Sequence, residues 1–174
     1  MSANTCIFQL SDETIKYWND NGLHPVENSE IATLEDYIGA KAPTGYIEFV
    51  KVFGGVDFGS NIPNRFSYSY IDNGYSEHFN QVVGHIKRPE RALRYYDGLR
   101  NDDDLKFPPN LLPFAMDLSQ GELFIEFGKP TEQIFYWNFD NHDWTNTHMR
   151  LGFVAHNMYD FLNNLKLDGG KAAY

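Results

Sequence analysis

The chain has 174 residues, the length of one ordinary domain. Folding a chain of this size can bury about 70% of its extended surface. Its 14 Lys and Arg residues against 24 Asp and Glu residues give a formal net charge of −10. This charge argues against a nucleic-acid-binding surface, because binding to phosphates depends on Lys and Arg. Aromatic residues make up 16% of the chain, which excludes a disordered or low-complexity protein.

Cysteine usage and the first residues bear on the compartment. The single cysteine, Cys6, cannot form an internal disulfide, and it leaves no cysteine pair for a zinc ribbon or a redox site. No apolar run reaches membrane-spanning length, and the start of the chain lacks the basic and apolar stretches of a secretory signal. We therefore expect a cytoplasmic protein that begins near Met1.

Three helices are expected in the first third of the chain. A short apolar stripe predicts a helix over 11–21. A second helix is predicted between Ser29, a suitable N-cap, and Gly39, a left-handed stop. A third is predicted to begin near Pro43 and to end at the glycine pair 54–55. The second and third of these helices are amphipathic, and we expect them to lie side by side.

From Phe66 the hydrophobic period changes from helical to two. Aromatic residues alternate with serine up to the turn sequence Asp72-Asn73-Gly74, which predicts a β-hairpin with a returning strand. The next predicted element is a helix over 88–100. Strands are predicted over 122–127 and 134–139, and both carry apolar residues on both faces, which favours central positions in a sheet.

The last predicted element is a helix near the C-terminus. Its apolar residues are Val154, Met158, Phe161, Leu162 and Leu165. Helices at both ends with hairpin-connected strands between them predict a single α+β domain over residues 1–174. We expect an antiparallel sheet flanked by N-terminal helices and a C-terminal helix.

Charge is unevenly distributed along the chain. Residues 87–100 hold five basic residues against two acidic ones, whereas residues 101–143 hold nine acidic residues against two basic ones. One interpretation is a solvated helix face beside solvated loops. The other is a charged surface that binds a partner.

The motifs of common catalytic and phosphate-binding sites are absent from the sequence. It contains neither a G-x-S-x-G elbow nor the glycine-rich phosphate loops. Asp140, His142 and Asp143 could hold a divalent ion, although such residues are also typical of a turn. Glu122 and Glu126 could act as paired carboxylates, but solvent-facing positions on a strand explain them without a substrate. We therefore expect no catalytic residue, no metal site and no cofactor.

Several motifs follow one another along the chain in a fixed order. They are Ile31–Gly39, Pro43, Tyr46–Gly55, Leu112–Asp117, Gly121–Phe124, Ile134–Asn138 and Phe161–Leu165. They form a helix ending in Gly, a Pro, a tyrosine-phenylalanine helix ending in a glycine pair, two groups of strands and a closing helix, and in this order they resemble the SUKH superfamily. The resemblance covers 29–165, with an insertion-like region over 66–110, and residues 1–28 lie outside the pattern.

This resemblance implies a protein-binding module and not an enzyme. SUKH proteins are mostly bacterial immunity proteins that bind and neutralise a cognate polymorphic toxin, often a nuclease or deaminase. Eukaryotic relatives act in cell-wall and signalling regulation. The family offers no catalytic residue to transfer, and its partner contacts vary between members.

The leading hypothesis is therefore an immunity protein whose acidic loops contact a toxin with a basic surface. The expected partner-binding residues are Asp102, Asp103, Asp104, Asp117, Asp140 and Asp143. No direct contact with nucleic acid or membrane is expected. The alternatives are a regulatory scaffold that binds endogenous proteins and, with less support, an enzyme or small-molecule binder around Asp140, His142 and Trp144.

Overall fold

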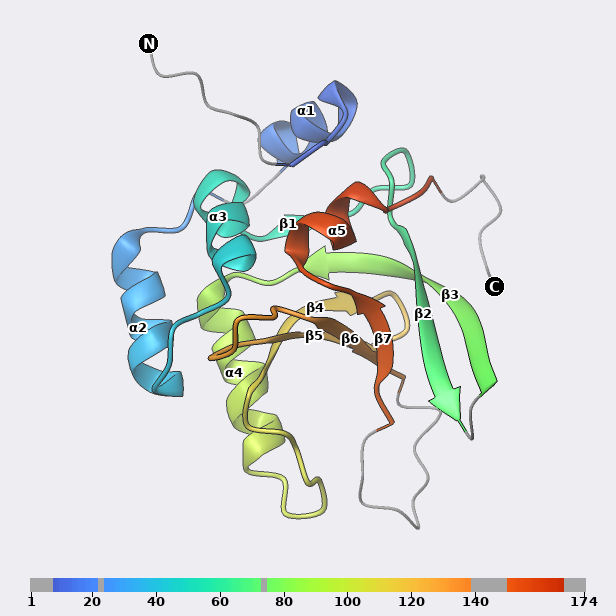
Figure 1. Ribbon diagram of the computed structural model, residues 1–174. Helices are drawn as coiled ribbons and strands as arrows, with labels where there is room; N and C mark the ends of the chain where they lie inside the picture. The colour runs from blue at the N-terminus through green and yellow to red at the C-terminus, as the bar shows by residue number, and fades with distance from the viewer. Residues whose placement is uncertain (1–7, 22–23, 73–74, 139–149, 168–174) are drawn as a thin grey trace.

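The computed structural model describes residues 8–21, 24–72, 75–138 and 150–167. The helices are α1 (Asp12–Asn21), α2 (Asn28–Ile38), α3 (Thr44–Phe53), α4 (Pro89–Arg100) and α5 (Met158–Asn163). The strands are β1 (Val56–Asp57), β2 (Arg65–Asp72), β3 (Tyr75–Ile86), β4 (Leu111–Asp117), β5 (Glu122–Glu126), β6 (Ile134–Trp137) and β7 (Gly152–Ala155). Figure 1 shows the helices gathered around a curved sheet.

The strands form one antiparallel sheet in the order β1-β3-β2-β7-β6-β5-β4. An additional pairing between β3 and β4 joins the two sides of the sheet, so the sheet closes on itself like a barrel. The predicted α+β fold with an antiparallel sheet, N-terminal helices and a C-terminal helix is confirmed. β5 and β6 each have a neighbouring strand on both sides, as their two-sided apolar pattern predicted. Closure covers one face of β5, and Phe107, which packs between Tyr96 of α4 and Phe124, covers the other.

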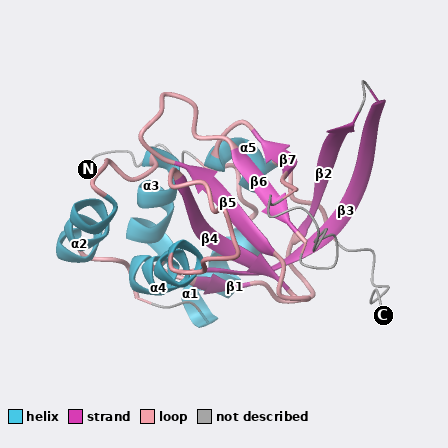
Figure 2. Cartoon of the chain, turned by 90° about the horizontal axis from the view of Figure 1, so that it is seen from below, coloured by secondary structure: helices cyan, strands magenta, loops and turns pink. Residues whose placement is uncertain are grey.

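The β2–β3 hairpin is the longest pairing in the sheet. Its register runs from Arg65 opposite Val82 to Asp72 opposite Tyr75. Its outer part, beyond Gln81, is exposed along β3 and projects from the rest of the described chain in Figure 2. Near Val83 the register of β3 shifts, and from that point β3 pairs with β4. The same strand therefore begins as a free ribbon and ends as part of the barrel.

The boundaries of α2, α3 and α4 follow the sequence signals except at the N-cap of α2. Gly39 ends α2 in the left-handed conformation at φ 69°, as its sequence position predicted. The N-cap of α2 is Glu27 and not Ser29, because Glu27 and Glu30 form a reciprocal capping box. α3 follows Pro43 and ends at Gly54, and α4 has Pro89 in its first turn.

The core consists largely of aromatic side chains that join the helices to the sheet. In α3, Tyr46 and Phe49 are fully buried, and the Phe49 ring meets the edge of Trp18 from α1 at a centroid distance of 5.4 Å. Across the barrel, the ring of Tyr136 lies 4.6 Å from that of Tyr68. Such edge and tilted contacts stabilise the fold by about 0.5–1.5 kcal/mol per pair, beyond the contribution from burying apolar surface. Core packing, rather than a ligand-stacking platform, explains these aromatic residues.

One predicted helix begins too early. Val154 lies in strand β7, where Phe153 pairs with Phe135 of β6, and the last helix begins only at Met158. The side chain of Asn157 accepts a hydrogen bond from Asp160 N–H at 2.9 Å and so caps the helix start. The helix also ends at Asn163, before Leu165. A four-residue strand has too little periodicity to be separated from a following helix by pattern alone.

Candidate functional site

The clearest exposed acidic feature is the acidic loop, Asp102–Asp104, which follows α4. All three aspartates are exposed. The N–H of Asp104 donates to Asp102 Oδ1 at 3.0 Å, an Asx-type turn that fixes the backbone of the loop. The loop therefore presents carboxylates to solvent, as the sequence predicted for these three residues.

Asp117 does not belong to such a surface. Its side chain is buried, with 3% of its surface exposed, at the end of β4. Its Oδ1 accepts the N–H groups of Ser119 and Gly121 at 2.7 Å each, and its Oδ2 accepts the Tyr136 hydroxyl at 2.5 Å. This carboxylate holds the β4–β5 turn, so the expectation that it lies in a partner-facing loop is replaced by a structural role.

The other two expected contact residues, Asp140 and Asp143, lie outside the described residues. The same is true of His142 and Trp144, and therefore of the small-molecule site considered around them. Among the residues that the structure describes, no group of three or more His, Cys, Asp or Glu side chains is placed to hold a metal ion.

Glu122 and Glu126 are not solvent-facing, contrary to the interpretation of their strand. Their exposed fractions are 2% and 7%. Closure of the sheet covers one face of β5. On the other face Lys87 reaches Glu122 and Phe107 packs against Phe124 at a ring-centroid distance of 5.5 Å, so alternate positions along β5 do not reach water. Glu126 is satisfied locally by Lys129 Nζ at 3.0 Å and by the Thr131 hydroxyl at 3.4 Å.

Glu122 forms a buried ion pair with Lys87, which lies between β3 and α4. Lys87 is 1% exposed, and its Nζ donates to the Glu122 carboxylate and, at 3.2 Å, to the Ala115 carbonyl. The Tyr95 ring centroid lies 4.4 Å from the same Nζ. Burial raises the pKa of Glu122 to about 7, and burial also lowers the pKa of Lys87. A sequence search for carboxylate pairs could not find this site, since its partner is a lysine 35 positions away.

The basic segment 87–100 is largely neutralised within the molecule. Besides Lys87, Arg88 donates to both oxygens of Glu30 at 2.9 and 3.0 Å, and Arg94 pairs with Glu90 at 2.8 Å. The hydrogen bond from the Arg88 guanidinium holds the pKa of Glu30 below its usual range. α4 therefore offers less positive surface than its residue count suggests.

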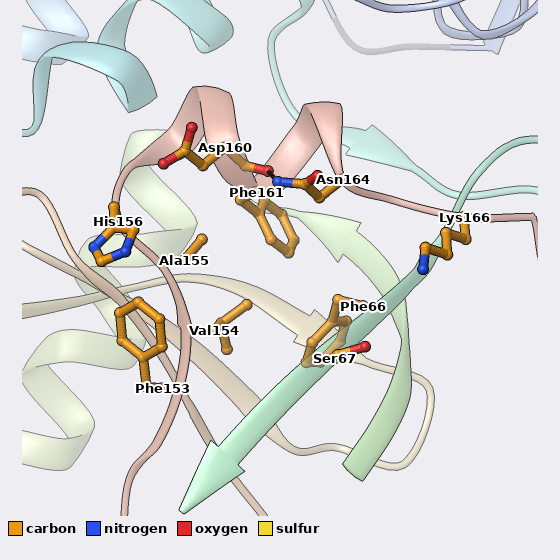
Figure 3. A pocket seen from close by; sticks show the side chains of 10 residues that line it. All are labelled: Phe66, Ser67, Phe153, Val154, Ala155, His156, Asp160, Phe161, Asn164 and Lys166. Atoms are coloured by element: carbon orange, nitrogen blue, oxygen red, sulfur yellow. Dashed lines mark hydrogen bonds between the residues drawn. The ribbon is translucent and has the colours of Figure 1, made fainter. Parts of the chain in front are cut away.

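A pocket of about 280 Å³ opens between β2, β7 and α5 (Figure 3). Phe66, Val154 and Phe161 supply apolar walls, and Figure 3 places His156 and Lys166 at opposite ends. The pocket is bounded where β2 and β7 meet at Ser69 opposite Phe153, and where Lys166 pairs with Arg65.

The polar groups of this pocket do not form a catalytic arrangement. Ser67 carries the only hydroxyl among the lining residues, and it donates to Asn80 Oδ1 at 2.7 Å and not to a base. The amide of Asn164 donates to the Asp160 carbonyl at 2.8 Å. Nucleophilic catalysis needs a nucleophile within hydrogen-bond reach of a base, and this lining lacks that pairing.

The sequence interpretation missed the exposed outer part of β3. Tyr75 is 79% exposed and Phe79 41% exposed, on a segment in which every side chain from 75 to 80 is exposed. The Asp72-Asn73-Gly74 signal predicted the hairpin, but it carried no information on whether the hairpin packs against the body of the protein. The aromatic side chains were therefore assigned to the core.

Comparison with known proteins gives a family. A search among curated proteins finds no match. None of the helices in the described residues is long and apolar enough to cross a membrane. The model of the SMI1 / KNR4 family (SUKH-1) matches residues 25–164, which cover the helices α2–α5 and the whole sheet. The chain therefore belongs to the SMI1 / KNR4 family (SUKH-1).

Proposed function

We propose that this protein is an immunity protein that neutralises a cognate bacterial toxin by direct binding. The observation that carries the proposal is membership of the SMI1 / KNR4 family over residues 25–164. The site geometry supports a binding role: the pocket between β2, β7 and α5 lacks a paired nucleophile and base, and the buried charged side chains of Lys87, Asp117 and Glu122 are hydrogen-bonded within the chain. The proposal requires no cofactor.

The acidic loop is the proposed contact surface for a basic toxin. Its three exposed carboxylates lie on a chain of net charge −10, and such a surface accelerates encounter with a nuclease that presents Lys and Arg. Asp140 and Asp143 remain part of this proposal as sequence-based candidates. Asp117 is excluded from it, because its side chain is buried and bonded within the chain.

Co-expression tests this function. The toxin domain encoded next to this chain's gene should arrest growth when expressed alone, and growth should recover when the full chain is co-expressed. The two proteins should also co-purify in a stable complex. If growth does not recover and the two proteins do not co-purify, the immunity role is contradicted. A gene with no toxin gene beside it would instead favour a regulatory scaffold that binds an endogenous protein.

A further inference from the structure

The outer part of β3 has a free strand edge. β2 pairs with one edge of β3 from Tyr75 to Val82, and β4 pairs with the other edge only from Val83 onward. Among the described residues, no strand continues along that second edge between Tyr75 and Val82. An unpaired edge presents a row of backbone donors and acceptors, which is a template for another strand.

The hydrogen bonds show which backbone groups line the free edge. Val83 N–H donates to the Asn64 carbonyl at 2.8 Å, on the side of β2. Because successive residues of an antiparallel strand point their N–H and C=O groups to opposite edges, those of Ser76, His78 and Asn80 point outward. Val82 N–H follows the same alternation, since it donates to the side chain of Gln81 at 3.0 Å and not to β2. The free edge therefore offers the N–H and C=O groups of alternate residues to an added strand.

The side chains beside this edge have the chemistry of a cation site. Tyr75, Glu77 and Phe79 lie on one face of the hairpin, because strand residues alternate between faces, and all three are exposed. A carboxylate between two aromatic rings suits Lys or Arg, which gain an ion pair and a ring contact together. Residues 66–86 contain no Lys or Arg.

The chain itself already places one guanidinium on this face. Arg150 lies 4.1 Å from the ring centroid of Tyr70, which is the register partner of Glu77. Its Nη2 is 3.6 Å from Glu77 Oε2. Glu77 remains 57% exposed in this contact, so its carboxylate can accept a second cation from outside.

We propose that the free edge of β3 receives an extended segment of the partner protein as an added strand, with a Lys or Arg side chain seated on the Tyr75–Glu77–Phe79 row. Main-chain hydrogen bonds to Ser76, His78 and Asn80 provide the pairing, and the row selects basic over acidic segments. The proposal rests on the proposed function for the nature of the partner, a protein with a basic surface.

A peptide experiment tests the edge without the toxin. The probes are a ten-residue peptide of alternating Lys and Thr and a matched peptide with Glu in place of Lys. Binding to the full chain is measured by fluorescence anisotropy and by amide NMR shifts. The basic peptide should bind at least about 10-fold more tightly than the acidic one, with shifts concentrated at residues 75–82.

Two variants separate strand addition from simple charge attraction. His78→Pro removes one outward N–H and blocks an incoming strand, and it should weaken binding by at least about 10-fold. The matched variant His78→Ala keeps the N–H and should stay within about 2-fold. Glu77→Lys keeps the backbone intact and should abolish the preference for the basic peptide. Circular dichroism and thermal unfolding confirm that each variant is folded.

The outcomes are decisive in either direction. The proposal is overturned if the basic peptide does not bind or if the two peptides bind equally well. It is also overturned if folded His78→Pro binds the basic peptide as tightly as the wild type and Glu77→Lys keeps the preference for that peptide. A homodimer in sedimentation that His78→Pro disrupts also overturns the proposal, because a second copy of the chain would then occupy the edge.

A further measurement separates this proposal from the immunity role. If the neighbouring toxin co-purifies but leaves the backbone amides of residues 76–80 unprotected from hydrogen exchange, the immunity role stands and the edge proposal fails. If the toxin neither rescues nor co-purifies while the peptide binds as expected, the reverse holds.

Discussion

Two regions of the molecule carry acidic residues in opposite ways. In the barrel wall, defined here by Lys87, Asp117 and Glu122, each charged group is nearly inaccessible and is hydrogen-bonded within the chain. In the acidic loop, the three aspartates lie in water. Both regions fall in or beside the stretch that the sequence shows as strongly acidic. We therefore expect the barrel wall to contribute mainly to folding stability and the acidic loop to contribute mainly to the encounter with a partner.

The largest effect is expected from breaking the buried ion pair. Replacing Lys87 by Met leaves Glu122 buried without its cation, and loss of one partner of such a pair costs about 3–5 kcal/mol. Urea unfolding should show this as a lower free energy of unfolding. The double variant Lys87→Met/Glu122→Leu removes both charges and should recover most of the loss.

An exposed pair provides the matched control for that experiment. Arg94 and Glu90 are 71% and 79% exposed, and Arg94→Met should change stability by less than about 1 kcal/mol. If Lys87→Met is as mild as Arg94→Met, the contrast between wall and surface is wrong.

The second effect concerns the β4–β5 turn. Asp117→Ala removes the acceptor of two backbone N–H groups and of the Tyr136 hydroxyl, and it should destabilise the protein by about 1–3 kcal/mol. Tyr136→Phe removes only one of these bonds and should cost less. The same urea series measures both variants, and a neutral Asp117→Ala would place this residue back among the surface acids.

The sequence predicted this fold better than it predicted the place of individual charges. Helical periodicity and the Gly39 stop gave α2, and the alternation after Phe66 gave the hairpin. The burial of Glu122 could not be inferred, because alternation along β5 is the same whether its polar face meets water or a covering element. Lys87 and, from α4, Tyr95 decide that question, because they cover the Glu122 face of β5 from positions distant in the sequence.

The third effect is a dependence of stability on pH that arises from Glu122 in the barrel wall. Burial raises the pKa of Glu122 from 4.5 to about 7, so between these values the folded state binds more protons than the unfolded state. The free energy of unfolding should therefore fall as pH rises from 4.5 to 7. The free energy of unfolding of the wild type minus that of Glu122→Gln, measured by urea unfolding across this range, isolates the effect. A flat difference curve would contradict the burial of an ionisable pair here.

His85, on β3, supplies a control of opposite slope. Burial lowers its pKa from 6.5 to about 4, so the unfolded state binds more protons between these values. The free energy of unfolding of the wild type minus that of His85→Gln should rise as pH increases from 4 to 6.5. Two curves of the same sign would show that a change in global charge, and not the two local environments, controls the response.

The smallest effect on stability, and the most specific effect on binding, is expected at the acidic loop. Replacing Asp102, Asp103 and Asp104 by Asn should leave the free energy of unfolding within about 0.5 kcal/mol, because exposed substitutions disturb little. The association rate with a partner identified by co-purification should nevertheless decrease and become less sensitive to salt, because steering by the exposed carboxylates is lost. A triple variant with the same change of charge elsewhere, Asp12→Asn/Glu13→Gln/Asp36→Asn, is the matched control in stopped-flow measurements at low and high salt. If both triples slow association equally, net charge alone steers the partner; if only the loop triple does so, the encounter surface lies at the end of α4.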